Sequence, residues 1–99
     1  MEEIQLKLDE QGRGAFCILE GGEEWGKMEI SVTSKMLTVY HTEVVPEAEG
    51  RGFAKKLLEA MVSHARNHGL KVLALCPFVQ AQFKRNPEAY TDIIQTRQP

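Results

Sequence analysis

The segment EGRGFAKK combines two glycines with three cations, a combination that can bind an anion. Gly50 and Gly52 flank Arg51, and Lys55 and Lys56 follow. A helix that begins here presents backbone N–H groups without intrahelical partners, together with the positive end of its dipole. Glycines leave room for a phosphate, and the cations add charge. The segment therefore predicts an anion site. The alternative is a glycine turn whose basic side chains are only solvated.

Three further residues could act on a substrate. Cys76 precedes Pro77, a residue that favours the first turn of a helix, so the thiol is expected at a helix N-terminus, where the dipole favours the nucleophilic thiolate. His41 and Glu43 are two residues apart on a predicted strand and therefore face the same side, where either could accept a proton. The alternatives are an inert core thiol, a solvated carboxylate and a hydrogen-bonded structural histidine.

The remaining reactive side chains are assigned structural roles. Cys17 lies in the middle of a predicted strand and is expected in the core. His64 and His68 are expected at the surface of a helix, and Tyr90 anchors the C-terminal segment, with the role of general acid as the alternative. No set of residues has the spacing of a metal site.

The elements that must position these residues follow from hydrophobic periodicity. Alternation of apolar and polar residues predicts four strands, and glycine-rich or polar turns separate them. These strands are residues 4–8, 15–20, 26–32 and 36–45. Turns this short favour an antiparallel meander.

The period changes after Pro46. Apolar residues at helical spacing predict a helix from Gly52 to His68, which Gly69 ends. The almost wholly apolar residues 71–76 predict a strand that is covered on both faces and runs parallel to the fourth, because a strand–helix–strand unit forms a right-handed crossover. A short helix is expected over residues 78–86. We expect an α+β fold with a mixed sheet and one domain over residues 1–99.

Composition limits the classes of function. The chain has 99 residues, a formal net charge of −2 and two cysteines. Interspersed charges disfavour broad nucleic-acid binding, and no apolar run has the length of a membrane span. The acidic, alternating N-terminus is unlike a signal peptide, and two distant cysteines favour reduced thiols. We therefore expect a cytoplasmic protein with neither nucleic-acid nor membrane partners. The oligomeric state is left open.

Several of these segments resemble the GNAT acetyltransferases. EGRGFA is similar to their pyrophosphate-binding pattern Q/R-x-x-G-x-G/A, with Gly52 and Ala54 in place and Glu49 where Gln or Arg is expected. HTEVVPEAEGRGFAKKLL and LCPFVQAQFKRNPEAYTDII resemble a minimal GNAT-like family of small single-domain proteins. The resemblance covers residues 24–94.

The resemblance implies a truncated GNAT-like fold that binds acetyl-CoA or coenzyme A between splayed parallel strands. The backbone of Val44 and Val45 would pair with the pantetheine arm. Lys56 or Arg51 would reach the 3′-phosphate. The N–H groups that would hold the pyrophosphate belong to Arg51, Gly52, Phe53, Ala54 and Lys55.

Two functions remain open under this resemblance. The first is an acetyl-CoA-dependent N-acetyltransferase acting on a protein lysine, an N-terminus or a small amine. Here Glu43 or His41 would be the base, and Cys76 is the proposed catalytic cysteine of the family, although direct transfer to the amine is the usual GNAT route. The second is a non-catalytic module that binds coenzyme A or an acyl-CoA. The acetyl acceptor is not identified by the sequence.

Overall fold

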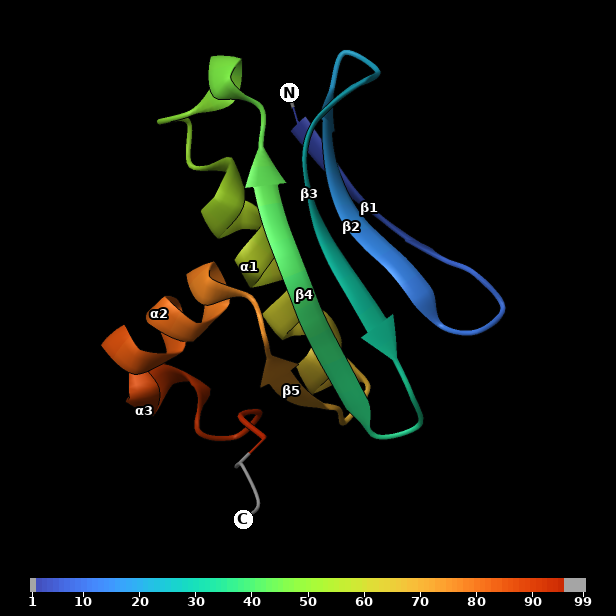
Figure 1. The fold of residues 1–99 in the computed structure, drawn as a ribbon, viewed down its shortest axis with the longest axis vertical. Helices are drawn as coiled ribbons and strands as arrows, with labels where there is room; N and C mark the ends of the chain where they lie inside the picture. The colour runs from blue at the N-terminus through green and yellow to red at the C-terminus, as the bar shows by residue number, and fades with distance from the viewer. Residues whose placement is uncertain (1, 96–99) are drawn as a thin grey trace.

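The computed structural model describes residues 2–95 and contains one five-stranded sheet with its helices packed behind and beside it (Figure 1). The strand order is β1-β2-β3-β4-β5; the first four strands are antiparallel, and β5 is parallel to β4. The predicted α+β fold is confirmed. The strands are β1 (Glu2–Leu8), β2 (Arg13–Glu20), β3 (Glu23–Val32), β4 (Met36–Val44) and β5 (Lys71–Ala74), and the helices are η1 (Pro46–Ala48), α1 (Phe53–Asn67), α2 (Pro77–Arg85) and α3 (Pro87–Tyr90).

The β2–β3 hairpin forms because its turn is glycine-rich. Gly21 and Gly22 both have positive φ, 63° and 84°. A two-residue turn with this backbone matches the twist of the flanking strands, and glycine reaches it without steric cost. The turn therefore brings the end of β2 beside the start of β3.

A β-bulge in β4 reverses its alternation. Val39 and His41 pair with consecutive residues of β3, so Tyr40 is an extra residue on β4. Val39 is buried against the helices, whereas His41 and Glu43 are exposed. A bulge has this effect because one inserted residue exchanges the faces of all the residues after it. Both candidate bases therefore face away from the core, although strict alternation would bury them.

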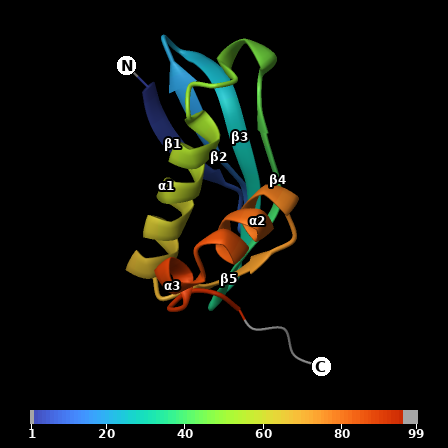
Figure 2. The same ribbon diagram turned by 90° about the vertical axis from the view of Figure 1, so that its left-hand side faces the viewer.

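Helix α1 supplies much of the core. Its buried stripe covers the inner faces of β2, β3 and β4, as Figure 2 shows from the side. The helix begins at Phe53 and ends at Asn67, close to the predicted bounds. The buried residues of this stripe are Phe53, Leu57, Leu58, Met61, Val62 and Ala65.

Strand β5 is shorter and less covered than the sequence predicts. It pairs with β4 only as far as Val39, and it ends at Ala74 because Cys76 is already the N-cap of α2. Leu75 is exposed, since β5 lies at the edge of the sheet and is not covered on both faces. Beyond this point β4 continues to Val44 while β5 turns away.

Among the described residues, no helix has the length and apolar character needed to cross a membrane.

Candidate functional site

The connection between β4 and α1 ends in consecutive backbone amides that donate no hydrogen bond within the described chain. Gly52 has φ 79° and turns the chain into α1 without a side-chain cap. Within the described chain, no protein acceptor bonds the amides of Gly52, Phe53, Ala54 and Lys55, and the first bonded amide is that of Lys56, 3.1 Å from the Gly52 carbonyl oxygen. These N–H groups point out of the start of the helix, where its dipole is positive.

A groove lies over these amides. Its volume is about 470 Å³, and it is lined by Val44, residues 48–50 and 52–55, and Phe78 of α2. A Cβ atom placed on Gly50 or Gly52 would meet nothing within 4 Å, so the space above both glycines is open. An anion can therefore approach the backbone directly, which is the property that the glycine spacing predicts.

The end of β4 borders the same groove. Pairing between the two parallel strands stops at Val39 and Ala74, with a last bond from the Leu75 amide to the Val39 carbonyl at 2.9 Å. Past that bond, β3 is the one strand among residues 2–95 that pairs with β4, so the other edge of β4 offers backbone groups as far as Val44. The Val45 amide, by contrast, donates to the carbonyl oxygen of Trp25 at 3.0 Å.

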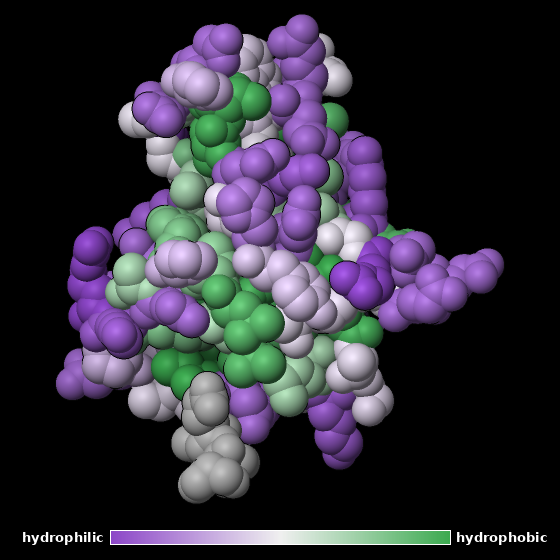
Figure 3. Space-filling model, viewed as in Figure 1, coloured by the Kyte–Doolittle hydropathy of each residue, from purple (hydrophilic) through white to green (hydrophobic). Residues whose placement is uncertain are grey.

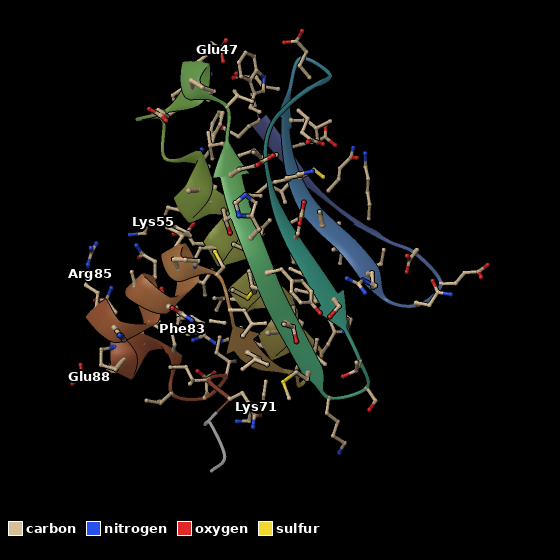
Figure 4. The ribbon with its side chains drawn as sticks, in the orientation of Figure 1. Glu47, Lys55, Lys71, Phe83, Arg85 and Glu88 are labelled. Carbon is tan, nitrogen blue, oxygen red and sulfur yellow. The ribbon has the colours of Figure 1, made fainter. Side chains whose placement is uncertain are left out.

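We call the unbonded amides of residues 52–55 the anion cradle. The three cations near it have different surroundings. The Arg51 guanidinium lies 2.9 Å and 3.0 Å from the carboxylate of Glu20, and Lys56 lies 2.9 Å from Glu2. Lys55 lines the groove and projects from the first turn of α1 on the side where α2 lies (Figure 4). Lys55 thus lines the groove, whereas the other two cations are held by carboxylates of β1 and β2.

Cys76 lies at the inner side of the strand end. It is the N-cap of α2, as predicted, but it is only 2% exposed and belongs to the main core. Its thiol donates to Oγ1 of Thr42 at 3.3 Å, so it contacts the part of β4 that has separated from β5. The predicted position is confirmed, and the predicted reactivity stays a prediction.

His41 and Glu43 form a pair on the opposite, helix-free face. His41 Nε2 lies 3.2 Å from Glu43 Oε1, and their side chains are 54% and 57% exposed. Glu43 also lines a second cavity of about 260 Å³ together with Glu24 and Val44. Val44 lines both cavities, so it separates the amide-lined groove from the carboxylate-lined one.

Figure 3 shows this face of the sheet covered mainly by hydrophilic side chains, with a hydrophobic area lower in the view, over β5 and α2. Leu75 is exposed and lines a pocket of about 590 Å³ with Phe83 and Ile94. Glu43 and the four unbonded amides belong to cavities at the end of β4 that share no lining residue with this apolar pocket.

Of two residues with predicted structural roles, Cys17 differs from expectation and Tyr90 agrees with it. Cys17 is buried, but on the helix-free face and outside the main core, where burial and neighbouring Glu24 raise the pKa of its thiol. The Tyr90 ring packs on Phe83 with centroids 4.8 Å apart, which agrees with an anchoring role.

Sequence reasoning missed three residues at the site: Phe78, which lines the groove, and Glu20 and Trp25, which contact the connection between β4 and α1. Phe78 lines the groove because α2 starts immediately after β5, and its proximity to Pro77 was the only available signal. Glu20 and Trp25 contact Arg51 and Val45, which are far from them in the sequence, so no local pattern indicates these contacts. In the described part of the chain, no group of three or more His, Cys, Asp or Glu side chains could hold a metal.

The chain is similar to a known family and to several solved structures. The profile of the GCN5-related N-acetyl-transferase family matches residues 15–93. A GCN5-like protein from Staphylococcus aureus has 27% identity and a TM-score of 0.66, over 95% of this chain and 90% of that one. No curated protein matches the sequence.

Two larger enzymes share the fold. The ribosomal-protein-alanine N-acetyltransferase from Brucella melitensis biovar Abortus 2308 has 17% identity and a TM-score of 0.63, over 92% of this chain and 66% of that one. The ribosomal-protein-S18-alanine N-acetyltransferase from Escherichia coli has 16% identity and a TM-score of 0.61, over 67% and 43%. This chain thus spans about half to two thirds of their length. With most of its residues matched by the family profile, the chain belongs to the GCN5-related N-acetyltransferase family.

Proposed function

We propose that the protein binds acetyl-CoA and transfers the acetyl group to an amine. One observation carries the proposal: the amides of Gly52, Phe53, Ala54 and Lys55 have no acceptor in the described chain and open into a groove at the start of α1. The donor set fits a pyrophosphate, because consecutive N–H groups at a helix N-terminus bind phosphate oxygens.

Other parts of the groove fit the pantetheine arm and the phosphates of acetyl-CoA. The free edge of β4 at Val44 offers backbone groups to the amides of a pantetheine arm, and Lys55 adds a positive charge beside the cradle. Arg51 and Lys56 stay candidates for a phosphate, provided that they leave Glu20 and Glu2. When bound, acetyl-CoA supplies a thioester whose acyl carbon an amine can attack.

Glu43 is the proposed base. An amine is a nucleophile only after it loses its proton, and a carboxylate at the end of β4 can accept that proton. His41 Nε2, which lies 3.2 Å from Glu43 Oε1, can stabilise the carboxylate and share the proton. Because Val44 lies between the two cavities, the amine would approach on the Glu43 side and the donor on the amide side.

The acceptor is proposed to be a protein lysine, a protein N-terminus or a small amine. Glu43 is more than half exposed on a face that no helix of the described chain covers, so a group projecting from a large molecule can reach it. The two similar enzymes from Brucella melitensis and Escherichia coli are named as N-acetyltransferases of ribosomal-protein alanine. That acceptor belongs to those two enzymes, and it is not carried over to this chain. We place the protein in the cytoplasm because both cysteines are free thiols.

The second candidate is a module that binds coenzyme A without transferring an acyl group. The observation in its favour is the same exposure of His41 and Glu43, because exposed acid–base groups lack the desolvation that strengthens catalysis. Both functions use the same groove and differ only in what happens on the helix-free face.

A paired experiment distinguishes them. Calorimetry with acetyl-CoA measures binding, and mass spectrometry of a lysine-containing peptide and of a set of protein and small-molecule amines measures transfer. The enzyme is expected to bind and to acetylate at least one amine above the uncatalysed rate. Binding without transfer to any of them would favour the module, and absence of binding would contradict both functions.

A further inference from the structure

Arg51 takes part in two well-defined contacts at the surface. Its guanidinium meets the Glu20 carboxylate with two nitrogen–oxygen distances, Nη1–Oε1 2.9 Å and Nη2–Oε2 3.0 Å. Its Cζ atom also lies 4.6 Å from the centre of the Phe53 ring. Two parallel bonds with a stacked ring hold an arginine in one orientation, unlike a single mobile contact between charged side chains.

A second contact fixes the other end of the connection. The Trp25 indole N–H donates to the Glu20 carbonyl oxygen at 3.2 Å, and the Trp25 carbonyl oxygen accepts the Val45 amide at 3.0 Å. Val45 begins the connection that Gly52 ends. Glu20 therefore holds Arg51 near one end through its carboxylate, and its backbone carbonyl holds Val45 at the other end through Trp25.

We infer that Glu20 is a positioning residue for the anion cradle. It holds the segment Val45–Gly52 against the β2–β3 hairpin and so keeps the amides of Gly52–Lys55 aimed into the groove before any ligand arrives. This inference rests on the proposed function for the identity of the ligand. Under this inference, Arg51 holds the connection of residues 45–52 in place, and Lys55 is the cation that contacts the phosphates.

The alternative role for Arg51 makes a prediction of opposite sign. If the guanidinium binds a phosphate directly, Glu20 competes for it, and removal of Glu20 should strengthen binding of coenzyme A. Removing a negative charge beside an anion site also favours binding on electrostatic grounds. If Glu20 positions the cradle, its removal should weaken binding, because the amides must then be ordered by the ligand itself.

The chain contains a matched control. Glu2 is also a strand residue whose carboxylate pairs with a cation of α1, Lys56, at 2.9 Å. That pair does not contact the Val45–Gly52 connection in any recorded hydrogen bond between described residues. Glu2→Ala therefore removes the same charge and a similar ion pair from a strand while leaving the connection held.

The experiment compares Glu20→Ala with Glu2→Ala in two measurements. Hydrogen exchange of the free protein, followed by NMR, reports the bonded amides of Val45 and Arg51; calorimetry reports the affinity for coenzyme A. Glu20→Ala keeps the backbone carbonyl that Trp25 bonds, so it tests the side-chain contact with Arg51. We expect it to speed exchange at the Arg51 amide at least threefold and to weaken binding at least fivefold. Glu2→Ala should change neither by as much as twofold. Circular dichroism and urea unfolding verify that each variant is folded.

The inference is overturned if Glu20→Ala binds coenzyme A as well as or better than the parent, or if exchange at the Arg51 amide is unchanged. Trp25→Phe, which keeps an aromatic ring and removes the indole N–H bond to the Glu20 carbonyl, should speed exchange at Val45 and provides a second variant if Glu20→Ala does not fold. Unchanged exchange at Val45 in this variant would contradict the hold on that end of the connection. The exchange measurement needs no ligand. A parent protein that does not bind coenzyme A would contradict the proposed function, while faster exchange would still show that Glu20 holds the connection.

Discussion

At the scale of single residues, the candidate site is made mainly of backbone. Gly52 turns into α1 with a left-handed φ, and the four amides of residues 52–55 are the groups that we propose bind the ligand. The cations that the sequence emphasises have a smaller part, because Arg51 and Lys56 are held by carboxylates. This explains why Glu49 can stand where the family pattern has Gln or Arg: its side chain is not needed to supply the cradle's N–H groups.

Gly52→Ala is expected to weaken coenzyme A binding severely. The left-handed backbone costs an alanine about 1 kcal/mol, so stability falls modestly while the loop and its amides shift. Gly69→Ala is the control, because Gly69 also has a positive φ, 67°, with open space around it, but lies at the far end of α1. Urea unfolding should show similar losses of stability in both variants, and calorimetry should show lost affinity only in Gly52→Ala. Equal affinities would contradict the cradle.

Glu43→Gln is expected to lower turnover by about 100-fold with little change in affinity for acetyl-CoA, because loss of a general base affects the amine and not the donor. The measurement is the steady-state rate of acetyl transfer, together with calorimetry. Glu23→Gln is the control, because Glu23 is an exposed carboxylate at the start of β3 that does not line the cavity of Glu43. Equal rates in the Glu43 and Glu23 variants would remove Glu43 from the mechanism.

Cys76→Ala is expected to retain most of the transfer activity. The thiol is buried and donates to Thr42 on the inner side of β4, whereas Glu43 lies on the other face. Direct attack by the amine then needs no covalent step on the protein. A loss of about 1,000-fold or more, typical of removing a nucleophile, together with an acetyl adduct on Cys76 of the parent, would instead support the covalent route.

At the scale of elements, periodicity predicted the meander, the long helix and the parallel strand, because each buries one regular face in a common core. Two features were not predictable from local pattern. The bulge at Tyr40 depends on pairing with β3, and it places His41 and Glu43 on the outer face. The early end of β5 depends on α2 starting at Pro77. The glycines and the helix start were enough to predict where a groove with unbonded amides opens, and binding of an anion there stays a prediction.

Helix α1 also contains a histidine, His64, whose protonation couples the stability of the protein to pH. Burial, with a smaller contribution from His68, lowers the pKa of His64 below its ordinary value of 6.5. The unfolded chain therefore binds a proton more readily than the folded one. Stability from this group is fully present above pH 6.5, declines as the pH falls toward the folded pKa, and then levels off.

Urea unfolding at pH 7.5 and pH 5.5 tests this expectation. The midpoint of the parent should fall more between the two values than that of His64→Gln, which cannot take up the proton. His41→Gln is the control, since His41 is exposed and contacts Glu43 and not the core. An equal fall in the parent and in His64→Gln would show that His64 does not couple stability to pH in this range.

At the scale of the whole molecule, the described elements form two layers with different tasks. Helices α1 and α2 cover the inner face of the sheet and border the groove, while the outer face of β3 and β4 presents polar side chains to solvent (Figures 2 and 3). The two cavities meet at Val44, where the parallel strands have separated. This arrangement allows a donor and an acceptor to approach one strand end from opposite faces of the sheet.

The most direct test of the central claim is an NMR titration of the isotopically labelled protein with acetyl-CoA. Binding at the start of α1 predicts that the largest shifts occur at the amides of residues 50–55 and at Val44, with a downfield change where N–H groups bond to phosphate. The amides of β1, at the far edge of the sheet, should stay unchanged. Shifts concentrated elsewhere, for example around Leu75 and Ile94, or no shifts at millimolar ligand, would contradict the account.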